Sequence, residues 1–383
     1  MSVFTFLHFL IAPVGVTGCD DRLFLLFRLV VLPGTTRGRG SSVTGSVSIK
    51  DVAAKAGVSP KTVSRVINGE RHVRPEVRAA VQRVVSELDY RPNAFARSLS
   101  SSRSYLLGLF IDDPSSGYAA DVQRGALLRC RDRSYHLVVE PIDFGSGDWA
   151  KAVAESILAL RLDGAILTPP ACDRADLLDV LDSHALPYVR VSPRGNADRS
   201  GLVWMDDVAA AREMTEHLLA LGHRDIGFVR GDPEHSVSQR RWDGFQAAMA
   251  DARIVPREDR VAPGDFSFLS GLAAGERLLG APERPTAVFA SNDDMALGVL
   301  MAAVKLGLSV PDSLSIAGFD DAPTSRAAWP QLTTIRQPKA EMAAAAVDIL
   351  VDPRYRDDVG AGAYRKLLPF ELIARGSTAR AVY

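Results

Sequence analysis

Cysteine is scarce in this chain, with three residues among 383. Cys19, Cys130 and Cys172 are far apart and form no C-x-x-C pair. This count and spacing exclude a disulfide framework and a cysteine-based zinc site. We therefore expect a protein of the reducing cytoplasm, in which Cys130 and Cys172 are small buried or half-buried residues.

The chain also lacks the short motifs of common catalytic and nucleotide-binding sites. It has no G-x-x-x-x-G-K-[ST] phosphate loop, no G-x-S-x-G nucleophile elbow and no group of His, Cys and Glu at metal-ligand spacing. We therefore expect no enzymatic activity, no cofactor and no metal ion.

The first 46 residues lack a convincing membrane span or export signal. Their apolar runs cover residues 3–7 and 23–32, and Arg28 interrupts the second, which is about half a membrane span in length. No Lys or Arg precedes the first run. We expect residues 1–46 to be a disordered or mis-assigned extension, with Val43 or Val47 as alternative starts. A membrane anchor is the alternative.

The remaining composition is that of a soluble globular protein, with 47% hydrophobic and 24% charged residues. A chain of this length is expected to divide into two or three domains. Residues 46–103 carry eleven Lys/Arg and five Asp/Glu, whereas residues 104–383 carry thirty and thirty-nine. A small basic block joined to a large acidic body indicates a domain that binds a polyanion, attached to a body with another role.

Helix signals follow one another closely in the basic block. Ser48 and Asp51 form a capping box for a first helix, which Gly57 ends. Ser59 and Pro60 then begin a second helix that runs to about residue 67. A third helix begins near residue 75 and carries a single apolar stripe. Two short helices joined by a turn and backed by a third are typical of a helix-turn-helix domain.

The second helix would present its polar side chains to DNA. Val63, Val66 and Ile67 face inward. The outward residues are Lys61, Thr62, Ser64 and Arg65. An arginine can donate two hydrogen bonds to guanine, and hydroxyl side chains suit phosphate oxygens. The alternative is a generic three-helix bundle with a basic face.

Residues 48–103 closely resemble the DNA-binding head of the lactose-repressor family of bacterial regulators. The pieces IKDVA, AGVS, TVSRVIN, LDYRPN and ARSL occur in the order and spacing of that family. The resemblance implies a helix-turn-helix domain at residues 47–91 and a hinge helix with linker at residues 92–103. It also implies that Leu99 wedges between base pairs in the minor groove. The implied DNA-binding residues are Pro60, Lys61, Thr62, Ser64, Arg65, Asn68, Asn93, Arg97 and Leu99.

Residues 104–383 show apolar segments of strand length that alternate with helical segments. The expected strands are 106–111, 136–141, 164–168, 187–191, 226–229, 286–290 and 314–319. The expected helices are 121–131, 149–160, 208–221, 242–250, 270–279 and 295–306. Continuous apolar strands between helices predict buried parallel sheets, and a break near Asp206 predicts two lobes. The fold expected is therefore an all-α head on an α/β body of two parallel-sheet lobes.

The body resembles the two-lobed periplasmic sugar-binding proteins and continues the family match through HLLALGHRDIGFVRG, FASNDDMALG, SIAGFDD and PQLTTIRQP. Polar residues follow the expected strands, and ligands bind beyond the carboxyl ends of parallel strands. The resemblance makes Arg241 and Asp320 the leading ligand contacts, with Phe266 as a stacking ring. The full expected set is Tyr118, Ser192, Trp204, Ser238, Arg241, Phe266, Asn292, Asp320 and Gln337. For Phe266 and Trp204, core packing is the alternative.

The expected function is a transcription regulator, most simply a repressor, that binds near-palindromic double-stranded operator DNA as a homodimer. Its effector would be a mono- or disaccharide held between the lobes. Gly117, Tyr118, Ala119 and Ser192 depart from the family pattern, so the sugar is left open. A purine or other corepressor is the alternative, and a periplasmic sugar-binding protein would leave residues 48–103 unexplained. The C-terminus shows no apolar heptad, so we expect a dimer and not a tetramer.

Overall fold

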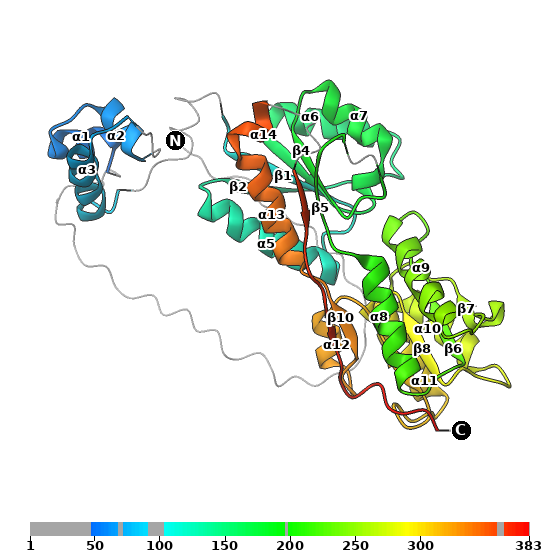
Figure 1. Ribbon diagram of the computed structural model, residues 1–383. Helices are drawn as coiled ribbons and strands as arrows, with labels where there is room; N and C mark the ends of the chain where they lie inside the picture. Colours follow the sequence, from blue (N-terminus) through cyan, green and yellow to red (C-terminus); the bar gives the residue numbers. More distant parts are fainter. Residues whose placement is uncertain (1–46, 68–71, 91–102, 196–197, 358–363, 383) are drawn as a thin grey trace, which may run out of the picture. The chain divides into compact units, whose positions relative to one another are not determined.

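The computed structural model describes residues 47–67, 72–90, 103–195, 198–357 and 364–382 (Figure 1). It divides the chain into two compact units, residues 1–91 and residues 92–383. The first holds the three helices expected from the basic block, and the second holds the sheets.

The first unit packs three short helices, α1 (Ile49–Ala56), α2 (Pro60–Ile67) and α3 (Pro75–Glu87), around a small core. The capping box is present, because the Ser48 N–H donates to Asp51 Oδ2 at 2.8 Å and Ser48 Oγ accepts the Asp51 N–H. Gly57 ends α1 in the left-handed region, with φ of 65°. The Val63 and Val66 side chains of α2 are buried, and Ile67 packs against the same core, as the sequence predicts.

The second unit begins with a sheet of six parallel strands in the order β11-β5-β4-β3-β1-β2. The strands are β1 (Leu106–Ile111), β2 (His136–Pro141), β3 (Gly164–Leu167), β4 (Tyr188–Val191), β5 (Gly201–Trp204) and β11 (Arg365–Leu367). Its helices are α5 (Gly117–Asp132), α6 (Trp149–Leu160), α7 (Ala175–Ser183), α13 (Lys339–Val351) and α14 (Pro353–Asp357). We call this part the first lobe.

The second lobe contains a four-stranded parallel sheet in the order β7-β6-β8-β9. Its strands are β6 (Ile226–Val229), β7 (Val261–Ala262), β8 (Ala287–Ala290) and β9 (Ser315–Ala317). Its helices are α8 (Asp207–Ala220), α9 (Ser236–Asp251), α10 (Phe268–Leu279), α11 (Asp293–Lys305) and α12 (Pro323–Ala327). Two parallel sheets are therefore present in the body, as the sequence pattern predicts.

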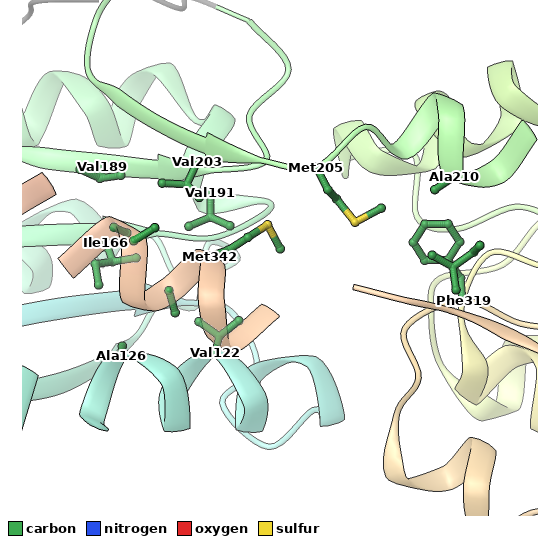
Figure 2. Close-up of a cluster of buried hydrophobic side chains, with 14 of the residues drawn as sticks. Val122, Ala126, Ile166, Val189, Val191, Val203, Met205, Ala210, Phe319 and Met342 are labelled. Carbon is green, nitrogen blue, oxygen red and sulfur yellow. The ribbon is translucent and has the colours of Figure 1, made fainter. Parts of the chain in front are cut away.

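The chain crosses between the lobes three times. The first crossing joins β5 to α8 close to Asp206, where the sequence predicts the break. The other two crossings carry β10 (Thr334–Arg336) and β12 (Glu371–Ile373), which pair as an antiparallel ribbon. Buried side chains continue through these crossings, and Figure 2 shows Met205 between Val203 in the first lobe and Phe319 in the second. One cluster of buried apolar side chains thus continues from one lobe into the other, and each lobe has a further cluster of its own.

Glycine allows α10 and α11 to pack at very short range. A Cβ on Gly298 would lie 2.4 Å from Phe268 O, and one on Gly271 would lie 2.3 Å from Met295 O. A side chain at either position would force backbone apart. This close contact fixes the position of the N-terminus of α11, which lies beside the cavity between the two lobes.

Most of the elements not anticipated from the sequence are short or lie in the crossings, with the 13-residue helix α13 as the exception. The full set is β5, β7, β10, β11, β12, α7, α12, α13 and α14. In addition, α9 begins at Ser236, six residues before the expected start at Trp242. The polar residues at the start of α9 hide its apolar periodicity, which becomes visible only from Trp242.

His223 holds the C-terminal segment against the second lobe and makes the stability of the folded protein depend on pH. The ring is 2% exposed, and its Nε2 lies 3.0 Å from Ala379 O and 3.0 Å from Ser315 Oγ. Burial lowers the pKa of His223 below its ordinary value of 6.5. The folded protein therefore favours the neutral ring. The stability that the buried neutral ring confers is lost as the pH falls from about 6.5 towards the lowered pKa.

We expect His223→Gln to reduce that loss. The free energy of unfolding, measured by urea titration at pH 7.5 and pH 5.5, should fall more between the two values in the wild type than in the variant. The variant loses stability at both pH values, so only the difference is informative. An equal fall in both proteins would contradict this account of His223.

Candidate functional site

Helix α2 presents a polar surface with the composition expected of a DNA-reading helix. Pro60, Lys61 and Arg65 are exposed, whereas Thr62 and Ser64 are half-buried. Thr62 Oγ1 lies 2.9 Å from Ser59 Oγ, and Ser59 Oγ accepts the Thr62 N–H at 3.1 Å. Thr62 therefore takes part in the cap of its own helix, and the long side chains that remain at the surface are those of Lys61 and Arg65.

Four predicted DNA-binding residues lie outside the described residues. They are Asn68, Asn93, Arg97 and Leu99. Their assignment, and that of the hinge at residues 92–103, remains a prediction from the resemblance.

The body has a cavity of about 480 Å³ lined by residues of both lobes, which we call the interlobe cavity. The first lobe contributes Asp112 after β1 and Ser192 after β4. The second lobe contributes Asn292 after β8 and Asp320 after β9. The cavity thus lies where the carboxyl ends of parallel strands face each other, the usual place for a ligand in such sheets.

Seven of the nine predicted ligand residues line this cavity. They are Tyr118, Ser192, Arg241, Phe266, Asn292, Asp320 and Gln337. The other two do not: Trp204 ends β5 and pairs with Leu367 of β11, and Ser238 is buried in α9 one turn before Arg241. The family resemblance suggested Trp204 as a wall of the site, but it does not show that β5 and β11 are neighbours in the first sheet.

Arg241 is the most firmly held polar group of the cavity. It is 4% exposed, its Nε donates to Asp207 Oδ1 at 3.1 Å, and its Nη1 donates to Ser291 O at 2.6 Å. Its guanidinium lies over the Phe319 ring at 3.8 Å from the centroid. These contacts use two of five N–H groups, so the guanidinium is fixed in place and still has donors for a ligand.

Asp320 provides the matching acceptor. Gln337 Nε2 donates to Asp320 Oδ1, and the Asp320 N–H donates to Ile335 O at 2.7 Å. Burial raises the pKa of Asp320, opposed by the positive charges of Lys339 and Arg241. Burial also raises the pKa of the Tyr118 phenol, so this group stays protonated and can donate a hydrogen bond. Donors and acceptors for hydroxyl groups therefore occur together.

Three of the lining residues have strained backbone. The φ angles of Ser192, Phe266 and Asp320 are 53°, 70° and 124°, in a region that favours glycine. Such conformations cost of the order of 1–3 kcal/mol each and cluster at ligand sites, where the surrounding structure holds them. Their coincidence at one cavity marks it as a functional site by a criterion that the sequence does not reveal.

Phe266 packs against the edge of the second-lobe core and is also held by polar neighbours. Asn292 Nδ2 donates to Phe266 O at 2.8 Å, while Asn292 Oδ1 caps α11 through the Met295 N–H at 2.9 Å. A Cβ on Gly231 would lie 2.1 Å from the Phe266 ring, so a glycine is needed there to make room. Phe266 therefore presents an apolar face in the cavity, and Asn292 helps to hold it.

The sequence analysis overlooked three residues that shape the cavity. His235 lines it, with its ring 5.3 Å from that of Phe266, while Asp207 and Phe319 hold Arg241. Asp207 lies in none of the quoted motifs, and Phe319 lies in SIAGFDD directly before Asp320 but was not assigned to the site. His235 stands directly before α9, and the expected start of that helix at residue 242 hid its place at the carboxyl end of the second sheet.

The described residues contain neither a candidate membrane span nor a candidate metal site. Over this part of the chain, none of the helices combines the length and the apolar character that crossing a membrane demands. Over the same residues, the His, Cys, Asp and Glu side chains form no group of three or more that could hold a metal ion.

A three-helix head with a polar second helix, and a two-lobed body with a polar interlobe cavity, define the class of ligand-regulated DNA-binding proteins. Comparison with known proteins agrees with this class. Residues 48–93 match the family model "Bacterial regulatory proteins, lacI family", and residues 215–378 match the "Periplasmic binding protein-like domain". The chain is 32% identical to catabolite control protein A of Priestia megaterium over 334 residues, which cover 87% of this chain and 99% of that protein.

Two solved structures are similar over almost their whole length. The lac repressor dimer bound to operator and the anti-inducer ONPF has a TM-score of 0.68 and 28% identity, with 87% of this chain and 99% of that one covered. The complex of the transcriptional regulator CelR with cellobiose has a TM-score of 0.65 and 29% identity, with 86% and 99% covered. The chain belongs to the lacI family of bacterial regulatory proteins, and is a DNA-binding transcription regulator.

Proposed function

We propose that this protein is a cytoplasmic repressor without catalytic activity, whose homodimer binds a near-palindromic operator and whose effector is an uncharged saccharide. The interlobe cavity carries the proposal. It combines a fixed guanidinium, a buried carboxylate and an aromatic face within one space. Hydroxyl groups of a sugar need both donors and acceptors, and its C–H faces pack on aromatic rings.

The effector would act through the relative arrangement of the lobes. Because the cavity is lined by both lobes, a ligand that contacts both favours one arrangement over the other. The change in operator affinity equals the differential affinity for the two arrangements, commonly about 1–3 kcal/mol. We assign the hinge at residues 92–103 as the element that transmits this change to the head.

The experiment that tests the proposed effector class is calorimetric titration of the full chain. The ligands are glucose, galactose, ribose, cellobiose, maltose and lactose, with adenine, guanine and hypoxanthine as the purine set. Binding of a saccharide that also changes operator affinity is the expected result. Binding of a purine alone, with stronger operator binding, would replace the saccharide by a purine corepressor.

We propose an exposed apolar surface on the second lobe as the dimer contact. Leu269 of α10, Met301 and Val304 of α11, and Trp329 after α12 are 71%, 41%, 59% and 89% exposed. These elements adjoin one another, since α11 packs against both α10 and α12. Apolar side chains that gather on neighbouring elements mark a protein interface, and two heads must be paired to read a palindrome.

A Val304→Asp/Trp329→Asp double variant is therefore expected to dissociate. Two carboxylates in an apolar interface should raise the Kd of the dimer by about 100-fold or more, and operator affinity should fall with it. Sedimentation velocity across a dilution series measures the first effect. Val255→Asp is the matched control, because Val255 is 86% exposed and lies elsewhere. A double variant that remains as dimeric as this control would refute the assigned contact.

A further inference from the structure

A second cavity adjoins the interlobe cavity, and we call it the outer cavity. It encloses about 870 Å³ and shares four lining residues with the interlobe cavity: Asp112, Asp113, Asp232 and His235. The first two lie after β1 in the first lobe, and the other two precede α9 in the second lobe. The shared residues form a neck to which both lobes contribute.

The neck is narrow and polar. His235 Nε2 lies 3.9 Å from Asp112 Oδ2 across the gap between the lobes. The Phe266 ring lies on the inner side, 5.3 Å from the His235 ring. A ligand unit seated against Phe266 therefore has the neck beside it, and a second unit joined to the first would enter the outer cavity.

The far wall of the outer cavity is a layered surface. The Arg174 guanidinium lies 4.5 Å above the centroid of the Phe144 ring, and the same ring packs edge-on against Trp149 at 5.3 Å. Asp176 holds Arg174 through two hydrogen bonds of 3.0 and 2.7 Å. The planar guanidinium is thus fixed by a ring beneath it and a carboxylate beside it, which makes it a rigid polar platform.

Asp173 supplies an acceptor at the same wall. Its Oδ1 accepts the Arg194 N–H at 2.6 Å, and its Oδ2 is shielded from solvent with no hydrogen-bond partner among the described residues. Buried polar atoms are nearly always paired, so an orphaned carboxylate oxygen beside a cavity calls for a donor. A hydroxyl group of a bound ligand provides this donor once a small movement of the cavity wall exposes Asp173 Oδ2.

The charge of the two cavities is strongly unbalanced. Nine carboxylates line them, against four arginines. Two of these arginines, Arg174 and Arg241, are already paired with carboxylates that line neither cavity, namely Asp176 and Asp207. A cleft that is lined mainly by charges of one sign, between walls of low dielectric constant, concentrates its electric field. The two cavities therefore repel anions and accept neutral ligands with hydroxyl donors.

We infer that the outer cavity is a second saccharide subsite, so that the effector is an uncharged disaccharide or longer saccharide and phosphorylated sugars are excluded. This inference rests on the proposed function of the interlobe cavity. The first unit occupies the interlobe cavity, and the second unit contacts Asp173 and Arg174. The glycosidic linkage passes the neck once the Asp112 and His235 side chains move apart from their 3.9 Å contact.

The test compares saccharides of different length and charge on the full chain by calorimetry. The probes are glucose, galactose, cellobiose, maltose, lactose, cellotriose and glucose 6-phosphate. A disaccharide should bind at least about tenfold more tightly than its constituent monosaccharide. Asp173→Asn and Arg174→Ala should each lower the affinity for the disaccharide about tenfold relative to the wild type. The affinity for the monosaccharide should stay within about twofold of the wild-type value. Glucose 6-phosphate should bind more weakly than glucose, and 0.5 M salt should narrow that gap.

Arg131→Ala, an exposed position on α5, is the matched control and should bind every probe as the wild type does. Equal affinity for monosaccharide and disaccharide with silent outer-cavity variants, or a sugar phosphate that binds as tightly as its parent sugar, would overturn the inference. If the inference fails in this way, the proposed function still holds provided that a monosaccharide binds and that the Asp320→Asn variant loses this binding. Binding of no saccharide would overturn both.

Discussion

An Asp320→Asn variant is expected to bind operator DNA as the wild type does and to lose its response to the effector. Asp320 is 8% exposed, lies at the end of β9 and is held by Gln337, so its carboxylate is oriented in the interlobe cavity. Hydrogen bonds to a charged acceptor contribute about 1.5–3 kcal/mol each. The asparagine keeps one acceptor and replaces the other by a donor, so effector affinity should fall by about 10- to 150-fold.

Two measurements check this prediction together. Calorimetry reports effector affinity, and fluorescence anisotropy of labelled operator reports DNA affinity with and without effector. Asp312→Asn is the control, because Asp312 is an exposed carboxylate of the same lobe. Unchanged effector affinity in Asp320→Asn would remove Asp320 from the site. A loss of operator binding without effector would show instead that the variant disturbs the fold.

Replacing Arg65 by alanine is expected to abolish sequence-specific DNA binding. Arg65 is exposed on α2, opposite the buried Val63 and Val66 that anchor the helix. One bidentate contact to guanine provides about 1–3 kcal/mol of discrimination, and a dimer contains two heads. The affinity for operator should therefore fall by about 30-fold or more, while binding to unrelated DNA should change little.

An Arg83→Ala variant on α3 distinguishes the loss of base recognition from the loss of a positive charge. Arg83 is also exposed, so its loss removes the same charge from another helix. This variant should weaken operator and unrelated DNA by similar factors and lower the salt dependence. If Arg65→Ala behaved in the same way, α2 would be a basic surface of a three-helix bundle and not a reading helix.

The three helices of the head could be predicted from sequence because their signals are local. Capping by Ser48, the left-handed Gly57 and the start of α2 at Pro60 each depend on residues within one helical turn. The same holds for β1, whose apolar run from Leu106 to Ile111 is continuous and is buried from Leu107 onward. Arg241 and Asp320 were identified through the family resemblance, and the interlobe cavity unites them.

The parts that escaped prediction depend on tertiary structure. Strand β5 has four residues and β7 has two, and their length leaves no period to detect. The role of Asp207 becomes visible only when α8 and α9 bring it to Arg241. Trp204 was assigned to the site through the family resemblance, but it ends β5 beside Leu367 of β11, a pairing that the sequence does not reveal. The outer cavity joins five distant segments and has no counterpart in any motif.

The most direct test of the account is selection of bound DNA from a random duplex pool by the full chain, repeated in the presence of each saccharide and purine. The account predicts enrichment of one near-palindrome, and a saccharide that changes its recovery. Enrichment that no saccharide alters would contradict the proposed effector class. Absence of any enriched sequence would contradict the central claim that this protein is an effector-controlled, sequence-specific regulator.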